Sequence, residues 1–461
     1  MKTRTEKDSI GSVKVAADRY WGSQTQRALQ YFQIGSQTFP RAMTKALGIV
    51  KKAAALTNCD LRKLDREKCR LICIACDEVI DGKLEGHFPL VVWQSGSGTQ
   101  TNMNANEVIA NRANELAGQS LGNKNFIHPN DHVNMSQSTN DSFPTCMHIA
   151  TVELTTATLL PALQNLIDTF TECEESFKDI IKVGRTHLMD ATPISLGQEF
   201  CGYKGQLQFA YRQIENSLKD LYEIALGGSS VGTGINTHPK FASWVAKRIS
   251  EITDRPFRSI PNKFMALSSH QAILKSHDAL KSLAVACAKI ANDIQFMASG
   301  PRSGLAEISL PNNEPGSSIM PGKSNPTQCE AMIMVAVKIM GNNTIMTNAT
   351  SSGHFELNTM KPLLIHTLLE SIQLLGDACR SFNENCVAGI KPKRTKINQY
   401  LQNSLMLATA LNEHIGYDEA VKIVQKAIEE GTTIREAAIN LGTLEAQTID
   451  SILQLDSMVK P

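Results

Sequence analysis

Long stretches of the chain place apolar residues at intervals of three and four, the spacing that puts them on one face of an α-helix. Between residues 198 and 225, Leu207, Tyr211 and Ile214 keep to one such face. The same period predicts long helices over residues 149–177, 198–225, 279–299, 326–341 and 361–385. Asn325 and Pro326 predict the start of the fourth helix, and Gly341 predicts its end. With few strand signals, the pattern predicts an all-α protein with a long central bundle.

Polar segments rich in Gly, Ser, Thr and Asn separate these helices, and in a helical protein such loops are where chemistry is expected. They cover residues 94–106, 134–145, 227–237 and 299–325. Changes in the pattern near residues 138 and 390 predict three domains. These are an N-terminal domain of residues 1–138, a central helical bundle of residues 139–390, and a small C-terminal helical domain of residues 391–461.

The charge balance excludes several classes of partner. The 461 residues include 46 Lys and Arg against 45 Asp and Glu, a formal net charge of +1. Nucleic-acid binding and polybasic membrane anchoring need an excess of one sign, so we expect neither. No run of 18 uncharged apolar residues occurs, so we expect no membrane span. Eleven scattered cysteines and a polar N-terminus predict a cytoplasmic protein, or a mitochondrial matrix protein if a transit peptide has been removed.

Two patterns imitate metal or nucleotide sites. Cys69, Cys73 and Cys76 have a spacing used by iron–sulfur clusters, but they also fall on one face of a predicted helix, which favours core packing. Gly322-Lys-Ser resembles the end of a phosphate-binding loop, but Gly316 lies six residues before Gly322, whereas that motif requires five. The histidines show no metal-ligand spacing. The sequence therefore predicts no metal and no organic cofactor.

Residues 316–330 concentrate chemical groups in a flexible loop that leads into a helix N-terminus. Ser317, Ser318, Lys323 and Asn325 lie within nine residues. Free N–H groups at a helix N-terminus, a lysine cation and a side-chain amide together favour an anion. Such a loop can hold a carboxylate and the further negative charge that develops when the neighbouring carbon loses a proton. The alternative is a mobile surface loop that ends in a well-capped helix.

This loop resembles the signature loop of the aspartase/fumarase superfamily. Further blocks resemble that family in the same order along the chain: Ser95-Gly-Ser-Gly-Thr-Gln-Thr-Asn-Met-Asn, Ile127-His-Pro-Asn-Asp, Gly184-Arg-Thr-His-Leu and residues 227–236. The blocks are most similar to class II fumarases. The resemblance implies the lyase fold of that family with a five-helix central bundle, a homotetramer whose active sites are shared between chains, and metal-independent, reversible hydration of fumarate to (S)-malate by carbanion chemistry.

The resemblance also implies roles for individual residues. Ser317 is expected to take a proton from malate. His187 is expected to act as the acid toward the departing hydroxyl, directly or through a water, with Glu330 paired to His187. Lys323 and Asn325 are expected to bind the carboxylate next to the carbanion. The remaining substrate contacts are expected from Ser97, Gly98, Thr99, Ser138, Thr139, Asn140, Thr186 and Ser318.

A second anion site is implied by His128, Pro129, Asn130 and Asp131. The alternative for this segment is a capping turn whose Asn and Asp bond their own backbone. Thr139 lies in a segment usually written Ser-Ser-Asn in fumarases, and its aspartase-like form keeps an aspartate ammonia-lyase open as an alternative. A catalytically inactive homologue is a third hypothesis, which the presence of Ser317, Lys323, Asn325 and His187 disfavours. Met189 and Ser324 also depart from the family pattern.

Overall fold

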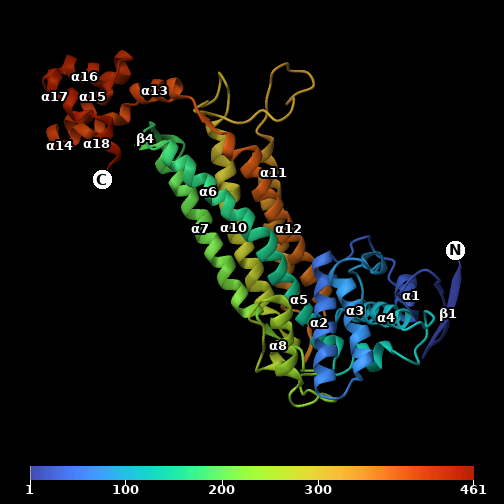
Figure 1. Cartoon of the computed structure of the whole chain (residues 1–461). Coiled ribbons are helices and arrows are strands. Elements are labelled where there is room, and N and C mark those ends of the chain that lie inside the picture. The colour runs from blue at the N-terminus through green and yellow to red at the C-terminus, as the bar shows by residue number, and fades with distance from the viewer. Residues whose placement is uncertain (1, 461) are drawn as a thin grey trace. The chain divides into compact units, whose positions relative to one another are not determined.

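The computed structural model describes residues 2–460 and is mainly helical, as the sequence predicts (Figure 1). The chain divides into two compact units. Unit 1 comprises the residues up to Pro161 together with Arg212–Ala284 and Val337–Gly376, and unit 2 comprises Ala162–Tyr211, Val285–Ala336 and the residues from Asp377 onward. The division into domains at residues 138 and 390 stays a prediction.

Five long helical segments contribute residues to both units. They are α5 (Thr139–Leu154) continued by a π-helical turn (Thr155–Leu159) and α6 (Leu160–Ser176), α7 (Leu196–Leu221), α10 (Gln271–Met297), α11 (Thr327–Thr350) and α12 (Lys361–Asn385). In unit 2 the rings of Phe170 and Phe200 join α6 to α7 at 5.7 Å. In unit 1, Asn342 of α11 donates to Ser371 of α12 at 3.0 Å. The predicted bundle of five helices is confirmed.

The predicted end of the fourth helix at Gly341 is wrong, since α11 continues to Thr350. The two residues after Gly341 bind neighbouring helices: Asn342 donates to Ser371, and Asn343 donates to Asp278 of α10 at 2.8 Å. A glycine in a helix costs only about 1 kcal/mol relative to alanine, which such tertiary contacts offset.

Unit 1 also holds an N-terminal β-hairpin and a set of shorter helices. Its further elements are β1 (Thr3–Asp8), β2 (Gly11–Ala16), α1 (Ser23–Tyr31), α2 (Arg41–Asp60), α3 (Arg66–Ile80), α4 (Thr99–Leu116), β5 (Glu223–Ile224), α8 (Phe241–Thr253), β6 (Arg258–Ser259) and α9 (Lys263–Ser268). Strands β1 and β2 pair antiparallel, and β5 and β6 pair in parallel. Cys69 and Cys76 are buried in a core cluster between α3 and α4, as predicted for apolar packing.

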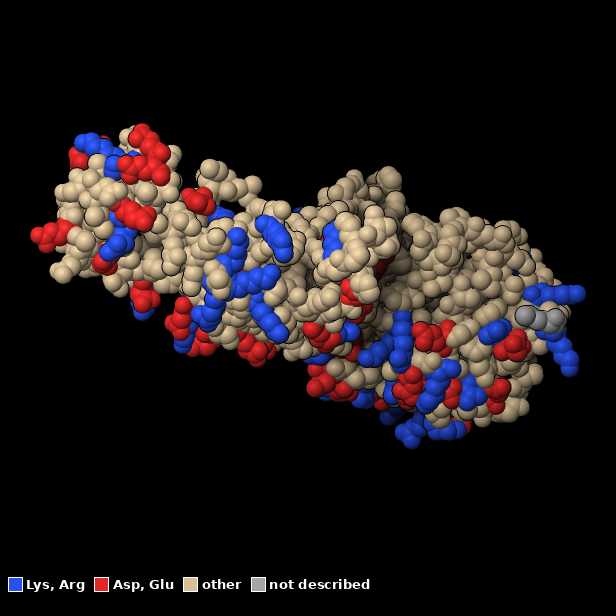
Figure 2. All heavy atoms as spheres, turned by 90° about the horizontal axis from the view of Figure 1, so that it is seen from above, with Lys and Arg blue, Asp and Glu red and all other residues tan. Residues whose placement is uncertain are grey.

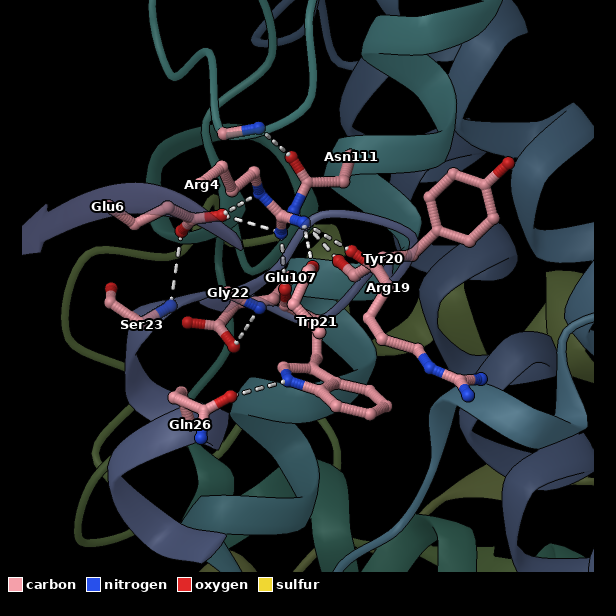
Figure 3. A network of polar contacts seen from close by, with 12 residues as sticks. Arg4, Glu6, Arg19, Tyr20, Trp21, Gly22, Ser23, Gln26, Glu107 and Asn111 are labelled. Atoms are coloured by element: carbon pink, nitrogen blue, oxygen red, sulfur yellow. Dashed lines mark hydrogen bonds and ion pairs between the residues drawn. The ribbon is translucent and has the colours of Figure 1, made fainter. Parts of the chain in front are cut away.

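Buried polar contacts attach the N-terminal hairpin to this core (Figure 3). Arg4 pairs with Glu6 at 2.7 Å and donates to the carbonyl oxygens of Arg19 and Trp21. Glu107 of α4 accepts three backbone N–H groups at the start of α1, those of Gly22, Gln24 and Thr25. The first turn of α1 is therefore capped by a side chain from another helix.

Unit 2 contains a second β-hairpin and the C-terminal helices. These elements are β3 (Ile181–Thr186), β4 (Met189–Ser195), β7 (Ile308–Ser309), β8 (Lys391–Pro392), α13 (Arg394–Gln402), α14 (Asn412–Ile415), α15 (Tyr417–Glu430), α16 (Ile434–Leu441), α17 (Ala446–Ile452) and α18 (Leu455–Val459). Val183 of β3 packs into the apolar core that these C-terminal helices form.

One helical stretch, Thr139–Ser176, has the length and mean hydropathy of a membrane span, and 56% of its most apolar 18-residue segment is buried inside the protein. Burial of this kind is typical of a core helix. On the face that Figure 2 shows, much of the surface is uncharged, and the basic and acidic side chains lie near one another along one edge and at one end. A nucleic-acid-binding surface is expected to carry an excess of positive charge, and this face shows charges of both signs.

Candidate active site

In unit 1 the N-termini of α4 and α5 lie together. The side-chain amide of Asn102, in the first turn of α4, donates to Thr139 Oγ1 at 3.0 Å. The hydroxyls of Ser97 and Thr99 lie 2.8 Å apart at the start of α4, and Ser138 caps α5 by accepting from the Asn140 N–H at 3.2 Å. The predicted Ser97, Thr99, Ser138, Thr139 and Asn140 are therefore gathered at two helix N-termini, which favour an anion.

Asp141 connects this place to the predicted loop of residues 227–237. One carboxylate oxygen accepts the Ser138 N–H at 2.9 Å, and the other accepts the N–H groups of Gly227 and Ser229 at 2.9 and 2.7 Å. Burial raises the pKa of Asp141 to about 6, against the lowering effect of these three hydrogen bonds. The side chain of Asn140 completes the connection by donating to Ser230 O at 2.8 Å.

In unit 2, Thr186 and His187 lie at the tip of the β3–β4 hairpin. Thr186 pairs with Met189, so His187 and Leu188 are the two loop residues, with φ of 54° and 62°. Two-residue hairpin turns with both φ positive normally use Asn or Gly, and a left-handed residue with a side chain costs about 1–2 kcal/mol. His187 is exposed, and Leu188 and Met189 are 78% and 69% exposed. Strain and exposed apolar residues at one tip are typical of a functional site.

The signature loop lies in unit 2 as well. Ser317 Oγ accepts the backbone N–H groups of Ile319 and Met320 at 3.3 and 3.0 Å, and these donors stabilise negative charge on the oxygen. Asn325 is not used as a helix cap in the way the sequence predicts: its amide donates to Gly316 O at 2.6 Å and closes the loop, and α11 begins at Thr327. Lys323 is exposed.

A hollow of about 860 Å³ in unit 2 brings the hairpin tip and the signature loop to one place. Leu188 lies on its wall with Lys323, Ser324 and Asn325. The predicted pair of His187 and Glu330 is not formed within the chain, since both side chains are exposed and no hydrogen bond or ion pair joins them within residues 2–460. The pairing of His187 with Glu330 therefore stays a prediction. Ser318, in the signature loop, is also exposed.

The predicted second anion site forms one wall of a separate cavity of about 520 Å³ in unit 1. His128 and Asn130 line it together with Lys7, Arg27 and Lys124. The segment is also a capping turn, but the cap comes from His128, whose Nδ1 accepts the N–H groups of Asn130 and Asp131 at 3.2 Å. Asp8 also lines this cavity and pairs with Arg27 at 2.8 Å, so Lys7 and Lys124 supply the positive charge that an anion site needs.

Comparison with known proteins identifies the family. A profile described as "Lyase" matches residues 11–341, and one described as "Fumarase C C-terminus" matches residues 407–460. The chain is 55% identical to a class II fumarate hydratase of Brucella suis, over 100% of this chain and 99% of the relative. The chain belongs to the class II fumarate hydratase family.

Two further relatives support this assignment. The chain is 54% identical to a mitochondrial fumarate hydratase of Rhizopus oryzae, over 99% of this chain and 93% of that relative. Its structure is similar to a crystal structure of a class II fumarase from Schistosoma mansoni, with a TM-score of 0.97, 41% identity and 100% of both chains covered. The fold is therefore the fumarase/aspartase lyase fold.

Two buried charged groups near the predicted site residues, Asp141 and Lys51, were not predicted from the sequence. Asp141 follows Ser138 at the spacing of a capping box, so a sequence signal for it exists. Lys51 is fully buried and donates to Asn134 and Gln137 at 2.9 and 3.0 Å, just before α5, and burial lowers its pKa to about 8. No local pattern marks Lys51, because its partners lie more than 80 residues away in the chain.

Proposed function

We propose that this chain is a lyase that catalyses the reversible hydration of fumarate to (S)-malate. The observation that carries the proposal is its likeness to class II fumarate hydratases over the full length. The site residues support it, because an exposed histidine, a charge-stabilised serine hydroxyl and a lysine all lie on unit 2 loops, and two anion-binding helix N-termini lie in unit 1. These are the groups that proton abstraction next to a carboxylate requires.

In the direction from malate, Ser317 removes a proton from the carbon next to one carboxylate. The electron pair left on that carbon spreads into the carboxylate, whose added negative charge is balanced by Lys323 and the amide of Asn325. The hydroxyl on the neighbouring carbon then leaves with a proton from His187, so water and fumarate are released. The N-terminal groups of α4 and α5, from Ser97 to Thr99 and from Ser138 to Asn140, bind the carboxylates of the substrate. Ser318 and Thr186 add hydrogen bonds.

The active enzyme is proposed to be a homotetramer with sites shared between chains. Support comes from α11, an apolar helix that leaves Met334, Val337 and Ile345 exposed at 68%, 61% and 40%. Phe209 of α7 and Val285 and Phe296 of α10 are also about half exposed. Apolar side chains spread along three helices need a partner surface, and other copies of the same bundle supply one. Sedimentation of an active monomer of 50.5 kDa would contradict this.

No metal ion or organic cofactor takes part in the proposed steps, since Ser317, His187 and Lys323 supply the base, the acid and the charge. All eleven cysteines are free in the structure, which suits a reducing compartment, the cytoplasm or the mitochondrial matrix. A chelator is expected to leave the activity unchanged. Complete loss of activity with a strong chelator would contradict the proposed steps.

The proposal is tested by supplying the purified protein with (S)-malate and, separately, with aspartate, and following the absorbance of fumarate. Fumarate from malate is the expected result. Fumarate from aspartate alone would identify an ammonia-lyase, and no fumarate from either substrate would identify an inactive homologue. The variant Ser317→Ala is the matched control, since it removes the proposed base and leaves Lys323 and Asn325 in place.

A further inference from the structure

A buried carboxylate holds both cations of strand β3. The side chain of Glu307 is 0% exposed and lies between Arg185 and Lys182. Arg185 Nη1 donates to both carboxylate oxygens, at 2.9 and 3.0 Å, and Lys182 Nζ lies 3.3 Å from Oε2. Glu307 is 122 residues from Arg185 in the chain, yet Arg185 comes only two residues before His187.

The local shape of β3 lets one carboxylate reach two such positions. Residues 182 and 185 point to opposite faces in a regular strand. Here the ladder between β3 and β4 shifts register between Val183 and Gly184, and such irregularities increase the twist of the strand. A Cβ atom on Gly184 would lie 2.4 Å from Thr192 O, so the close approach of the strands requires glycine.

The contacts continue from Glu307 to two helices of the bundle. Lys182 also donates to Glu199 of α7 at 2.8 Å. The hydroxyl of Tyr203 lies 3.3 Å from Glu199 Oε1 and 3.0 Å from Asp293 Oδ2 on α10, and Lys289 pairs with Asp293. Lys182 and Arg185 thus face Glu307 and Glu199, the balance that buried charges need, and Lys289 pairs with Asp293 nearer the surface. The base of the hairpin is attached to α7 and α10 by these contacts.

The tip of the hairpin has no comparable support within its own turn. His187 and Leu188 both adopt a left-handed backbone conformation, which residues other than Asn and Gly rarely adopt. Such conformations persist only where the surrounding structure holds them. We propose that Glu307 is a positioning residue, whose pairing with Arg185 and Lys182 holds the β3–β4 hairpin so that His187 is presented for proton transfer. This inference rests on the role proposed above for His187.

The test is Glu307→Gln, which keeps the shape of the side chain and removes its charge. We expect kcat to fall about tenfold to a hundredfold with KM changed less than about threefold, because a displacement of about 1 Å at a catalytic group has an effect of that size. Glu307→Asp, which keeps the charge, should recover part of kcat. In the background of His187→Asn, Glu307→Gln should cause no further loss, because both changes act through one group.

The control is Glu6→Gln in unit 1. Glu6 forms the same kind of buried pair with Arg4, with a side chain 2% exposed (Figure 3). It lies in the β1–β2 hairpin and not in the β3–β4 hairpin. This variant should keep the wild-type kcat. Amide hydrogen exchange of the peptide 181–195 should become faster in Glu307→Gln and stay unchanged in Glu6→Gln.

Unchanged exchange in the hairpin of Glu307→Gln would overturn the inference. So would a loss of kcat that multiplies with that of His187→Asn, because Glu307 would then act through another group. If His187→Asn keeps the wild-type turnover, the proposed role of His187 fails. Exchange in the peptide 181–195 would then still decide whether Glu307 holds the hairpin.

Discussion

Replacing Gly98 by alanine should move the N-terminus of α4 and damage substrate binding. Gly98 precedes Thr99 in a left-handed conformation with φ of 82°. An added Cβ atom would lie 2.3 Å from Cε2 of Phe143, whereas ordinary contacts begin near 3.4 Å. Phe143 is fully buried and packs edge-on against Phe39 at 5.9 Å, so its ring has no free space to enter.

The size of the effect follows from the left-handed backbone of residue 98 and from the contact with Phe143. Left-handed backbone with a side chain costs about 1–2 kcal/mol, and forcing an extra methyl group into a packed core costs about 1–3 kcal/mol. Gly98→Ala should therefore lower the free energy of unfolding by about 2–5 kcal/mol. Relief of the contact requires Gly98 and the ring to separate by about 1 Å, a displacement that lowers kcat/KM about a hundredfold when it affects substrate-binding groups.

Gly118→Ala is the matched control at the other end of the same helix. Its φ is 74°, but no atom lies within 4 Å of an added Cβ. The free energy of unfolding of this variant should fall only by the backbone cost of about 1–2 kcal/mol. The assay is kcat/KM for (S)-malate together with the midpoint of thermal unfolding of both variants. Equal losses of activity in the two variants, or wild-type activity in Gly98→Ala, would refute the reasoning.

The remaining predictions concern the two histidines and one buried lysine. His187→Asn should lower kcat by about two to four decades, the range for a general acid or base. The kcat of His128→Asn should stay within about tenfold of the wild type. Steady-state kinetics in which His128→Asn loses more activity than His187→Asn would show that the two roles are reversed. Burial lowers the pKa of Lys361 from 10.5 to about 7, and its amine donates to Asn358 O at 2.5 Å. From about pH 7 to 10 the folded state therefore binds fewer protons than the unfolded state, and stability rises with pH. Between about pH 7 and 9 the thermal midpoint of the wild type should rise relative to that of Lys361→Met, and a constant difference would contradict the lowered pKa.

The sequence by itself determined the class of fold and much of the bundle. Helix α12 has the bounds that the apolar period predicts, Lys361–Asn385. Helix α10 begins at Gln271, eight residues before the predicted start, because His277 there is buried by contacts with Ser371 and Asn343 rather than by an apolar period. The resemblance of separate motifs also located the loops with Ser317, Lys323 and His187, since these groups depend on residue type at short spacing.

Only the tertiary structure decided which distant side chains meet. The contact of Glu307 with Arg185, that of Asp141 with Gly227, and the continuation of α11 beyond Gly341 all depend on residues far apart in the chain. The conformation of His187 and Leu188 likewise departs from what their residue types favour. Periodicity reports which face of an element is apolar, but the packing of whole helices and hairpins sets which polar groups become buried together, and a buried charge must then find its partner there.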